Sequence, residues 1–355
     1  MLKEHNVQLE MNAVVMDRFG PSSVLEYRKV PVEPPSDDEV LIEVHAVSVN
    51  RTLDLNVRTN GDGRSVTLPH ILGVDPSGIV VEIGSEVENF HPGDRVAVIA
   101  TRCGQCASCQ NGDRCERQFH PGVERWGGYA EYITVPSWTL LALPETMGFA
   151  EATVLLRHYP TAHHLLAALG KVSPSEHVLV LGSAGGLGSA AVEVAVRLGA
   201  EVIAGAGAEE RVQASMSRGA LWGVNYRSED LADRVMEFTN GKGVDVLVEN
   251  IGEPKLWSEA FSCVGRGGRV VTAGAHGGGT VTLDLRRLYQ NRISIFGSSG
   301  RTEQDIDWVL KEHGVKAFRP LIGAVMPLFE ARRAHDLVET NAITGKIILD
   351  PRAHL

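Results

Sequence analysis

Hydrophobic and polar positions follow two different patterns along this chain of 355 residues. Between residues 11 and 145, short apolar runs alternate with turns rich in glycine and proline, such as His91-Pro92-Gly93-Asp94. Runs of this kind predict the antiparallel strands of a partly barrel-shaped domain. The expected strands are Asn12–Met16, Glu39–Ser48, Ser77–Ile83, Arg95–Ala100 and Gly128–Val135.

From Val178 onward the pattern changes to strand, glycine turn and amphipathic helix, repeated several times. Six strands are expected at Val178–Gly182, Glu201–Ala206, Gly223–Tyr226, Val244–Ile251, Gly268–Gly274 and Arg292–Phe296. Helical periodicity separates them at Ser189–Leu198, Glu209–Arg218, Glu229–Thr239 and Trp257–Val264. This alternation predicts an α/β fold with a doubly wound parallel sheet of the Rossmann type.

The last segment, from Arg301, is expected to return to the first domain. It shows a helix at Glu303–His313, a short strand at Val325–Pro327, another helix and a closing strand at Lys346–Leu349. The length of the chain favours two domains. We therefore predict a β-rich domain of residues 1–152 and 300–355 and a Rossmann domain of residues 153–299.

Composition narrows the classes of partner. The net charge is −10, and no run of lysine and arginine could neutralise several phosphates, so we expect neither nucleic-acid nor membrane binding. Charged residues such as Lys3 and Glu4 interrupt any apolar signal-peptide core, and Glu193 and Arg197 interrupt the longest apolar run. A cytoplasmic protein is the expectation.

A glycine-rich turn follows the first strand of the Rossmann pattern. It reads Ser183-Ala184-Gly185-Gly186-Leu187-Gly188 and precedes a helix. Gly185 and Gly186 permit a close approach of the backbone to a pyrophosphate, and Gly188 permits tight packing of helix on strand. A tight turn without a ligand is the alternative, but the strand-turn-helix context favours dinucleotide binding.

The end of the second strand bears on which dinucleotide binds. An acidic residue here would bind the ribose hydroxyls of NAD, but this chain has Ala206. The absence of that acid removes repulsion against a 2′-phosphate, and Arg211 could pair with the phosphate. Glu209 and Glu210 would oppose it. We expect NADP(H), with NAD(H) as the alternative.

Four of the five cysteines fall within 13 residues, at Cys103, Cys106, Cys109 and Cys115. Four thiolates on one loop can close a tetrahedral shell around zinc and leave no position for substrate. We therefore expect one structural zinc. The alternative is four reduced cysteines without metal.

Further motifs connect the chain to a known family. They are Gly73-Val74-Asp75-Pro76-Ser77-Gly78, Pro92-Gly93-Asp94-Arg95-Val96 and Gly127-Gly128-Tyr129-Ala130-Glu131-Tyr132. Together with the cysteine and glycine loops, they resemble the medium-chain dehydrogenase/reductase superfamily, which includes zinc alcohol dehydrogenases and quinone oxidoreductases. The resemblance implies a GroES-like first domain, a small-molecule substrate, and a homodimer that pairs through Arg292–Phe296. The family's last cysteine interval is seven residues, whereas here it is five.

The resemblance also implies where a catalytic zinc would bind. The three ligand positions match Asn50, Val74 and Arg157, and the acid beside them matches Asp75. Valine has no donor atom and arginine is a cation, so no catalytic zinc is expected. In this respect the chain resembles quinone oxidoreductases and enoyl reductases, which reduce conjugated carbonyls or quinones.

Several residues are candidates for that chemistry. We expect Arg157, anchored by Asp75, to stabilise the developing oxyanion, with Asn50 or Tyr159 as other donors. Tyr159 or His158 could deliver the proton. A buried structural pair of Asp75 and Arg157 is an equally weighted alternative.

The remaining cofactor candidates come from the resemblance and from strand ends. Thr161 matches a threonine beside the nicotinamide, and Tyr226 matches a tyrosine near the adenosine phosphate. Asn250, Gly274 and Ala275 stand where ligands gather in open α/β sheets. The predicted activity is NADPH-dependent reduction of an activated C=C bond or quinone. Two alternatives remain: a carbonyl reductase or alcohol dehydrogenase without zinc, and an NADP(H)-binding regulatory protein without turnover.

Overall fold

The computed structural model describes residues 9–99, 103, 105–111, 115–117 and 120–353, and these form two compact units. Unit 1 comprises Met1–Thr153 and Ile322–Leu355, and unit 2 comprises Val154–Leu321. The sequence placed the whole segment 300–355 in the β-rich domain. The structure corrects this, because residues 300–321 group with unit 2.

Unit 1 is the β-rich, GroES-like body that the sequence predicted. A small sheet has the order β2-β1-β4, and a larger one has the order β15-β16-β3-β5-β6-β8, with β7 also paired to β3. Its strands are β1 (Glu10–Met16), β2 (Leu25–Pro31), β3 (Glu39–Ser48), β4 (His70–Ile71), β5 (Ser77–Ile83), β6 (Arg95–Val98), β7 (Tyr132–Pro136), β8 (Leu140–Ala142), β15 (Ile322–Pro327) and β16 (Lys346–Asp350). Nearly all side chains of β3 are buried, which explains why most of its residues are apolar.

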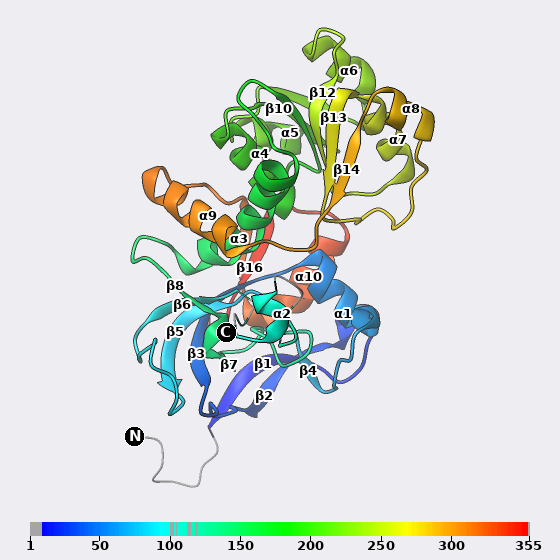
Figure 1. Cartoon of the computed structure of the whole chain (residues 1–355). Coiled ribbons are helices and arrows are strands. Elements are labelled where there is room, and N and C mark those ends of the chain that lie inside the picture. The colour runs from blue at the N-terminus through cyan, green and yellow to red at the C-terminus, as the bar shows by residue number, and fades with distance from the viewer. Residues whose placement is uncertain (1–8, 100–102, 104, 112–114, 118–119, 354–355) are drawn as a thin grey trace. The chain divides into compact units, whose positions relative to one another are not determined.

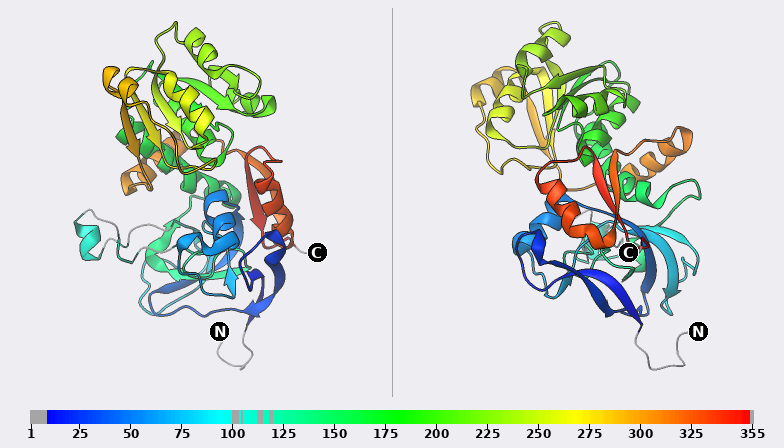
Figure 2. Two further views of the ribbon diagram at one scale, coloured as in Figure 1. Left: turned by 90° about the vertical axis from the view of Figure 1, so that its right-hand side faces the viewer. Right: turned by 180° about the vertical axis from the view of Figure 1, so that it is seen from behind.

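Described segments from the N-terminal and C-terminal parts of the chain pack together inside unit 1. Its helices are α1 (Asn56–Asn60), α2 (Ala107–Gln110) and α10 (Ala331–Glu339). Figure 2 shows α10, in red, beside the blue N-terminal segment, and Arg332 donates to the carbonyls of Ser23 and Leu25 at 3.0 and 3.2 Å. Strand β16 pairs with β3 at Leu349 and Val47, which brings Lys346 to the end of β3.

Unit 2 has the predicted Rossmann architecture. Its parallel sheet has the order β11-β10-β9-β12-β13-β14, so the strand order reverses at β9, and helices lie on both faces (Figure 1). The strands are β9 (His177–Leu181), β10 (Glu201–Ala206), β11 (Trp222–Asn225), β12 (Val244–Glu249), β13 (Val264–Thr272) and β14 (Ser294–Gly297). The helices are α3 (Phe149–His163), which belongs to this unit from Val154 onward, α4 (Gly186–Arg197), α5 (Glu209–Met216), α6 (Leu231–Phe238), α7 (Pro254–Ser262), α8 (Leu285–Gln290) and α9 (Glu303–Val315). Open sheets of this order bind ligands at the carboxyl ends of the strands near the reversal.

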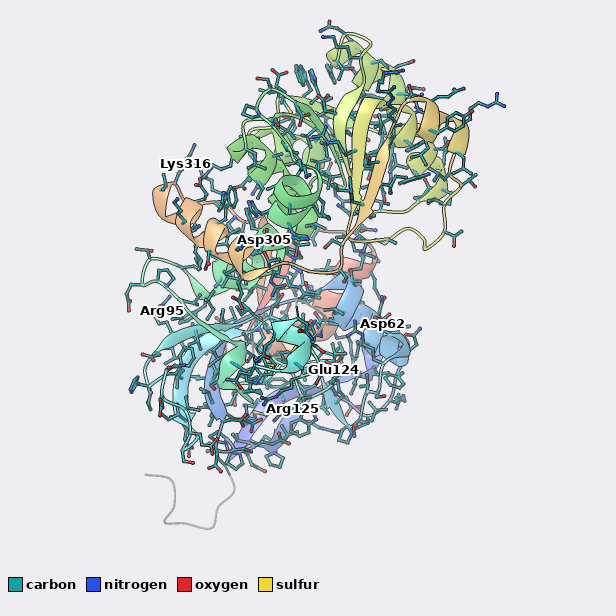
Figure 3. All side chains as sticks on the ribbon, in the orientation of Figure 1. Asp62, Arg95, Glu124, Arg125, Asp305 and Lys316 are labelled. Atoms are coloured by element: carbon teal, nitrogen blue, oxygen red, sulfur yellow. The ribbon has the colours of Figure 1, made fainter. Side chains whose placement is uncertain are left out.

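Polar contacts explain why α9 belongs to unit 2. Asp305 and Lys316 mark the two ends of this helix in Figure 3. The buried Asp305 carboxylate binds Nδ1 of His163 at 2.6 Å and Nδ1 of His164 at 3.0 Å, and Arg197 pairs with Glu312 at 3.0 Å. Among the helices that the structure describes, none has the length and apolar character needed to cross a membrane.

Candidate active site

The predicted phosphate loop leads from β9 into α4, which begins at Gly186. A Cβ atom on Gly188 would lie 2.1 Å from the carbonyl oxygen of Gly182, so the tight helix-strand packing expected of Gly188 is confirmed. Ser183 is fully buried, and its Oγ accepts a hydrogen bond from Ser215 at 2.8 Å. No side chain caps α4 at Gly185, so the first-turn N–H groups of Gly186, Leu187 and Gly188 can bind a phosphate.

The imidazole of His158, on α3, lies beside this loop. A Cβ atom on Gly186 would lie only 2.6 Å from Nε2 of His158. The small size of Gly186 therefore admits the His158 ring as well as the expected close approach to a pyrophosphate. Sequence reasoning did not place His158 beside the phosphate loop, because nothing in the sequence links α3 to that loop.

Two arginines lie at the end of β10, where the acid characteristic of NAD sites is absent. Ala206 is buried there. A Cβ atom on the next residue, Gly207, would lie 3.2 Å from Nε of Arg227 and 3.3 Å from the hydroxyl oxygen of Tyr226. Burial raises the pKa of Tyr226, and the positive charges of Arg227 and Arg211 act against that rise. Sequence reasoning missed Arg227, although it directly follows Tyr226.

Other predicted cofactor residues gather at neighbouring strand ends. Nδ2 of Asn250, which follows β12, donates to the carbonyl of Leu181 at 3.3 Å. Gly274 packs beside Asn250, because a Cβ atom there would lie 3.1 Å from the Asn250 carbonyl oxygen, and Ala275 follows it. Thr161 lies on α3 and its hydroxyl donates to the Arg157 carbonyl at 3.4 Å. Unit 2 therefore joins Asn250 and Gly274 to the strand that leads into the phosphate loop.

The two predicted catalytic residues of unit 1, Asn50 and Asp75, are buried and hydrogen-bonded to each other. Nδ2 of Asn50 donates to Asp75 at 3.0 Å and to Oγ of Ser48 at 3.2 Å. Asp75 also accepts the backbone N–H of Ser48 at 3.0 Å and its hydroxyl at 2.7 Å. On the other side, Oδ1 of Asn50 accepts from Nζ of Lys346 at 2.7 Å. Sequence reasoning missed Ser48 and Lys346.

These contacts decide whether a catalytic zinc fits. Oδ1 of Asn50 is bound to an ammonium, and its Nδ2 group, which could not ligate a metal, is bound to Asp75 and Ser48. Val74 is buried and has no donor atom. A zinc site needs nitrogen, sulfur or oxygen donors around one point, so these residues do not fit the metal. Arg157 belongs to unit 2, and its predicted pairing with Asp75 stays a prediction.

Tyr159 requires a correction. It is fully buried, its ring packs on Phe318 at a centroid distance of 4.8 Å, and its side chain acts against the rise that burial causes in the pKa of Glu193. A fully buried hydroxyl beside the largely buried Glu193, inside unit 2, is not placed to donate to a substrate. The sequence could not show this, because Glu193 reads as a solvent-facing residue of α4.

The four cysteines converge as the sequence predicted. Their sulfur atoms all lie within 4.8 Å of one another, with Cys103 to Cys109 at 4.0 Å and Cys106 to Cys115 at 3.9 Å. A tetrahedral shell with Zn–S bonds of about 2.3 Å places its sulfurs roughly 3.8 Å apart. Backbone N–H groups of Cys109 and Glu116 lower the pKa of Cys106 to about 6, which favours the thiolate that binds metal. The cluster fits one structural zinc.

Comparison with known proteins agrees with this geometry. Residues 36–145 match the alcohol dehydrogenase GroES-like domain, and residues 186–313 match the zinc-binding dehydrogenase family. The quinone oxidoreductase of Sus scrofa is 31% identical over 347 residues, which cover 96% of this chain and 97% of that protein. The NAD-dependent alcohol dehydrogenase of Sulfolobus acidocaldarius is 29% identical over 348 residues, covering 96% and 99%.

A solved structure is similar over the same length. The crystal structure of an NAD-dependent alcohol dehydrogenase is 34% identical, superimposes with a TM-score of 0.89, and covers 96% of this chain and 99% of its own. Both domain matches and the full-length similarity confirm the resemblance seen in the motifs. The chain therefore belongs to the medium-chain dehydrogenase/reductase superfamily and is an NAD(P)-dependent oxidoreductase of that family.

Proposed function

We propose that this enzyme uses NADPH to reduce an activated C=C bond, in an α,β-unsaturated carbonyl or a quinone, without a catalytic zinc. One observation carries the proposal: the hydrogen bonds of Asn50 and the apolar side chain of the buried Val74, which match two zinc-ligand positions of the family by resemblance, do not fit the metal. A bound zinc would act as a Lewis acid that polarises the oxygen of a simple ketone. A conjugated acceptor spreads the developing charge over several atoms and can be reduced with hydrogen-bond donors alone.

The chemistry assigns roles to residues of the chain. Bound NADPH would supply a hydride to the β-carbon of the conjugated system, so that charge develops on the carbonyl oxygen. We assign Arg157 as the donor to that oxygen and His158 or water as the source of the proton. Asp75 and Asn50 shape the region where a metal would otherwise bind. Tyr159 has no part in the proposal.

The preference for NADPH rests on the end of β10. Arg227 and Arg211 lie near Tyr226, and Ala206 stands where NAD enzymes have an acid. A guanidinium binds phosphate in bidentate fashion, so Arg227 and Arg211 favour a 2′-phosphate, whereas Glu209 and Glu210 oppose it. One structural zinc in the cysteine cluster and a homodimer through the exposed edge strand β14 complete the proposal.

Product analysis tests this proposal. Purified enzyme with NADPH is offered a cyclic enone, the matching saturated ketone and a benzoquinone, and products are identified by gas chromatography. We expect the enone to yield the saturated ketone, the quinone to be reduced, and the saturated ketone to remain unchanged. Formation of an allylic or saturated alcohol would instead identify a carbonyl reductase. Tight NADPH binding with no product from any acceptor would identify a binding protein without turnover.

A further inference from the structure

A lysine from the last strand lies among the residues that replace the zinc ligands. Lys346 begins β16 and is only 7% exposed. Its ammonium donates to the Val49 carbonyl at 2.6 Å and to Oδ1 of Asn50 at 2.7 Å. Nδ2 of the same Asn50 side chain donates to Asp75, so one amide connects a buried cation to a buried anion. A charge buried this far from water must be compensated by other charges.

A second buried carboxylate shares this region. Asp54 is completely buried, and its two oxygens accept the backbone N–H groups of Asn50 at 2.7 Å and of Gly73 at 3.0 Å. Asp54 therefore ties together the two segments that carry the zinc-ligand positions, those of Asn50 and Val74. Burial and then the negative charge of Asp75 raise the pKa of Asp54, and the positive charge of Lys346 lowers it, so the three charged groups act on one another.

A hydrogen-bonded chain supports Asp54 from the other side. Arg58 can only donate, so Nδ1 of His335, at 3.2 Å, is the acceptor, and the ring proton lies on Nε2. Nε2 then donates to the Tyr129 hydroxyl at 3.1 Å, and that hydroxyl donates to Asp54. Burial and Arg58 lower the pKa of His335 to about 3, so the ring stays neutral. Three donors thus point at Asp54 and favour its ionised form.

We propose that Lys346 supplies a fixed positive charge where zinc-dependent members of the family hold their metal. It acts as a positioning residue: it orients Asn50 and offsets the charges of Asp54 and Asp75. This inference rests on the proposed function, in which negative charge develops on a substrate oxygen. Without Lys346, two buried carboxylates would repel that charge, because like charges interact strongly away from water.

The test compares Lys346→Met, which keeps length and loses charge, with Lys346→Arg, which keeps charge. Lys255→Met is the matched control, because the Lys255 side chain is 85% exposed. With NADPH and the enone between pH 5.5 and 9, Lys346→Met should lower kcat roughly 10- to 100-fold. KM for NADPH should stay within about twofold, since the phosphate loop lies in unit 2. Lys346→Arg should recover most of kcat. Equal kcat in Lys346→Met and wild type would overturn the proposal.

A second readout does not depend on turnover. Urea unfolding of the same variants is followed from pH 5 to pH 8. At pH 5 Asp54 is largely protonated, so loss of the ammonium should cost little, whereas at pH 8 two charged carboxylates remain without it. The loss of stability in Lys346→Met should therefore grow with pH, and Lys255→Met should show none. A pH-independent loss would mean that Lys346 only packs, and would overturn the inference even if the enone proves not to be a substrate.

Discussion

Asp54 offers a direct measure of the electrostatics in unit 1. Burial and the charge of Asp75 raise its pKa from the ordinary 3.8 to about 7, against the effects of Lys346 and two backbone N–H donors. An acid whose folded pKa is raised stabilises the fold fully below its unfolded pKa. That stability is lost as pH rises through the folded pKa. Between pH 4 and pH 8, Asp54 should therefore destabilise the folded protein progressively.

The magnitude of this destabilisation follows from the shift in the pKa of Asp54. One pKa unit corresponds to 1.36 kcal/mol, so a rise from 3.8 to about 7 corresponds to about 4 kcal/mol. Asp54→Asn removes the titration and keeps the shape. The variant should lose about 1 to 3 kcal/mol at pH 4, because one amide hydrogen must face a backbone N–H donor. Relative to wild type it should then gain about 4 kcal/mol by pH 8.

Urea unfolding by tryptophan fluorescence at half-unit steps of pH provides the measurement. Asp307→Asn, on the exposed face of α9, controls for the chemical change itself. The reasoning fails if the difference between Asp54→Asn and wild type is flat with pH. It also fails if the variant becomes relatively less stable as pH rises. That second result would mean that the hydrogen bonds from Asn50, Gly73 and Tyr129 outweigh burial and hold the pKa below 3.8.

Two further predictions concern the cofactor and the metal. Arg227→Met should weaken NADPH binding about tenfold or more and leave NADH binding within about twofold, measured by quenching of nicotinamide fluorescence; equal losses for both would remove Arg227 from the 2′-phosphate site. Elemental analysis should find about one zinc per chain in wild type and none in Cys109→Ser, whereas about two in wild type would restore a catalytic metal and make alcohol chemistry the leading interpretation.

The sequence predicted those parts of the fold in which local pattern and burial agree. The bounds of β3 and β5 match the prediction, because both are mostly apolar runs, rich in valine and isoleucine, between turns. It missed β2, whose residues Leu25–Pro31 are largely polar and partly exposed, since this strand lies at the edge of the small sheet. It misassigned α9, because helical periodicity does not show that Asp305 binds His163 and His164.

The candidate site, like the fold, could be predicted from the sequence only in part. The phosphate loop was predictable because its glycines, strand and helix are consecutive, and the structure gives Gly188 the packing role expected of it. Arg227 was missed because the sequence does not reveal that its guanidinium folds back over Gly207. A short motif identifies residues whose backbone has a role. It does not identify a side chain that reaches the site from a neighbouring turn.

Matching residues to the family could show that zinc ligands are missing, but it could not show what takes their place. Asn50 and Lys346 are 296 residues apart, and a lysine at the start of a strand reads as a solvated side chain. Only the pairing of β16 with β3 buries that lysine beside Asn50. Two carboxylates, an amide and an ammonium now occupy the region. Burying a cation of this kind costs desolvation free energy. Removal of the Lys346 charge should therefore first change the chemistry of the site and the dependence of that chemistry on pH.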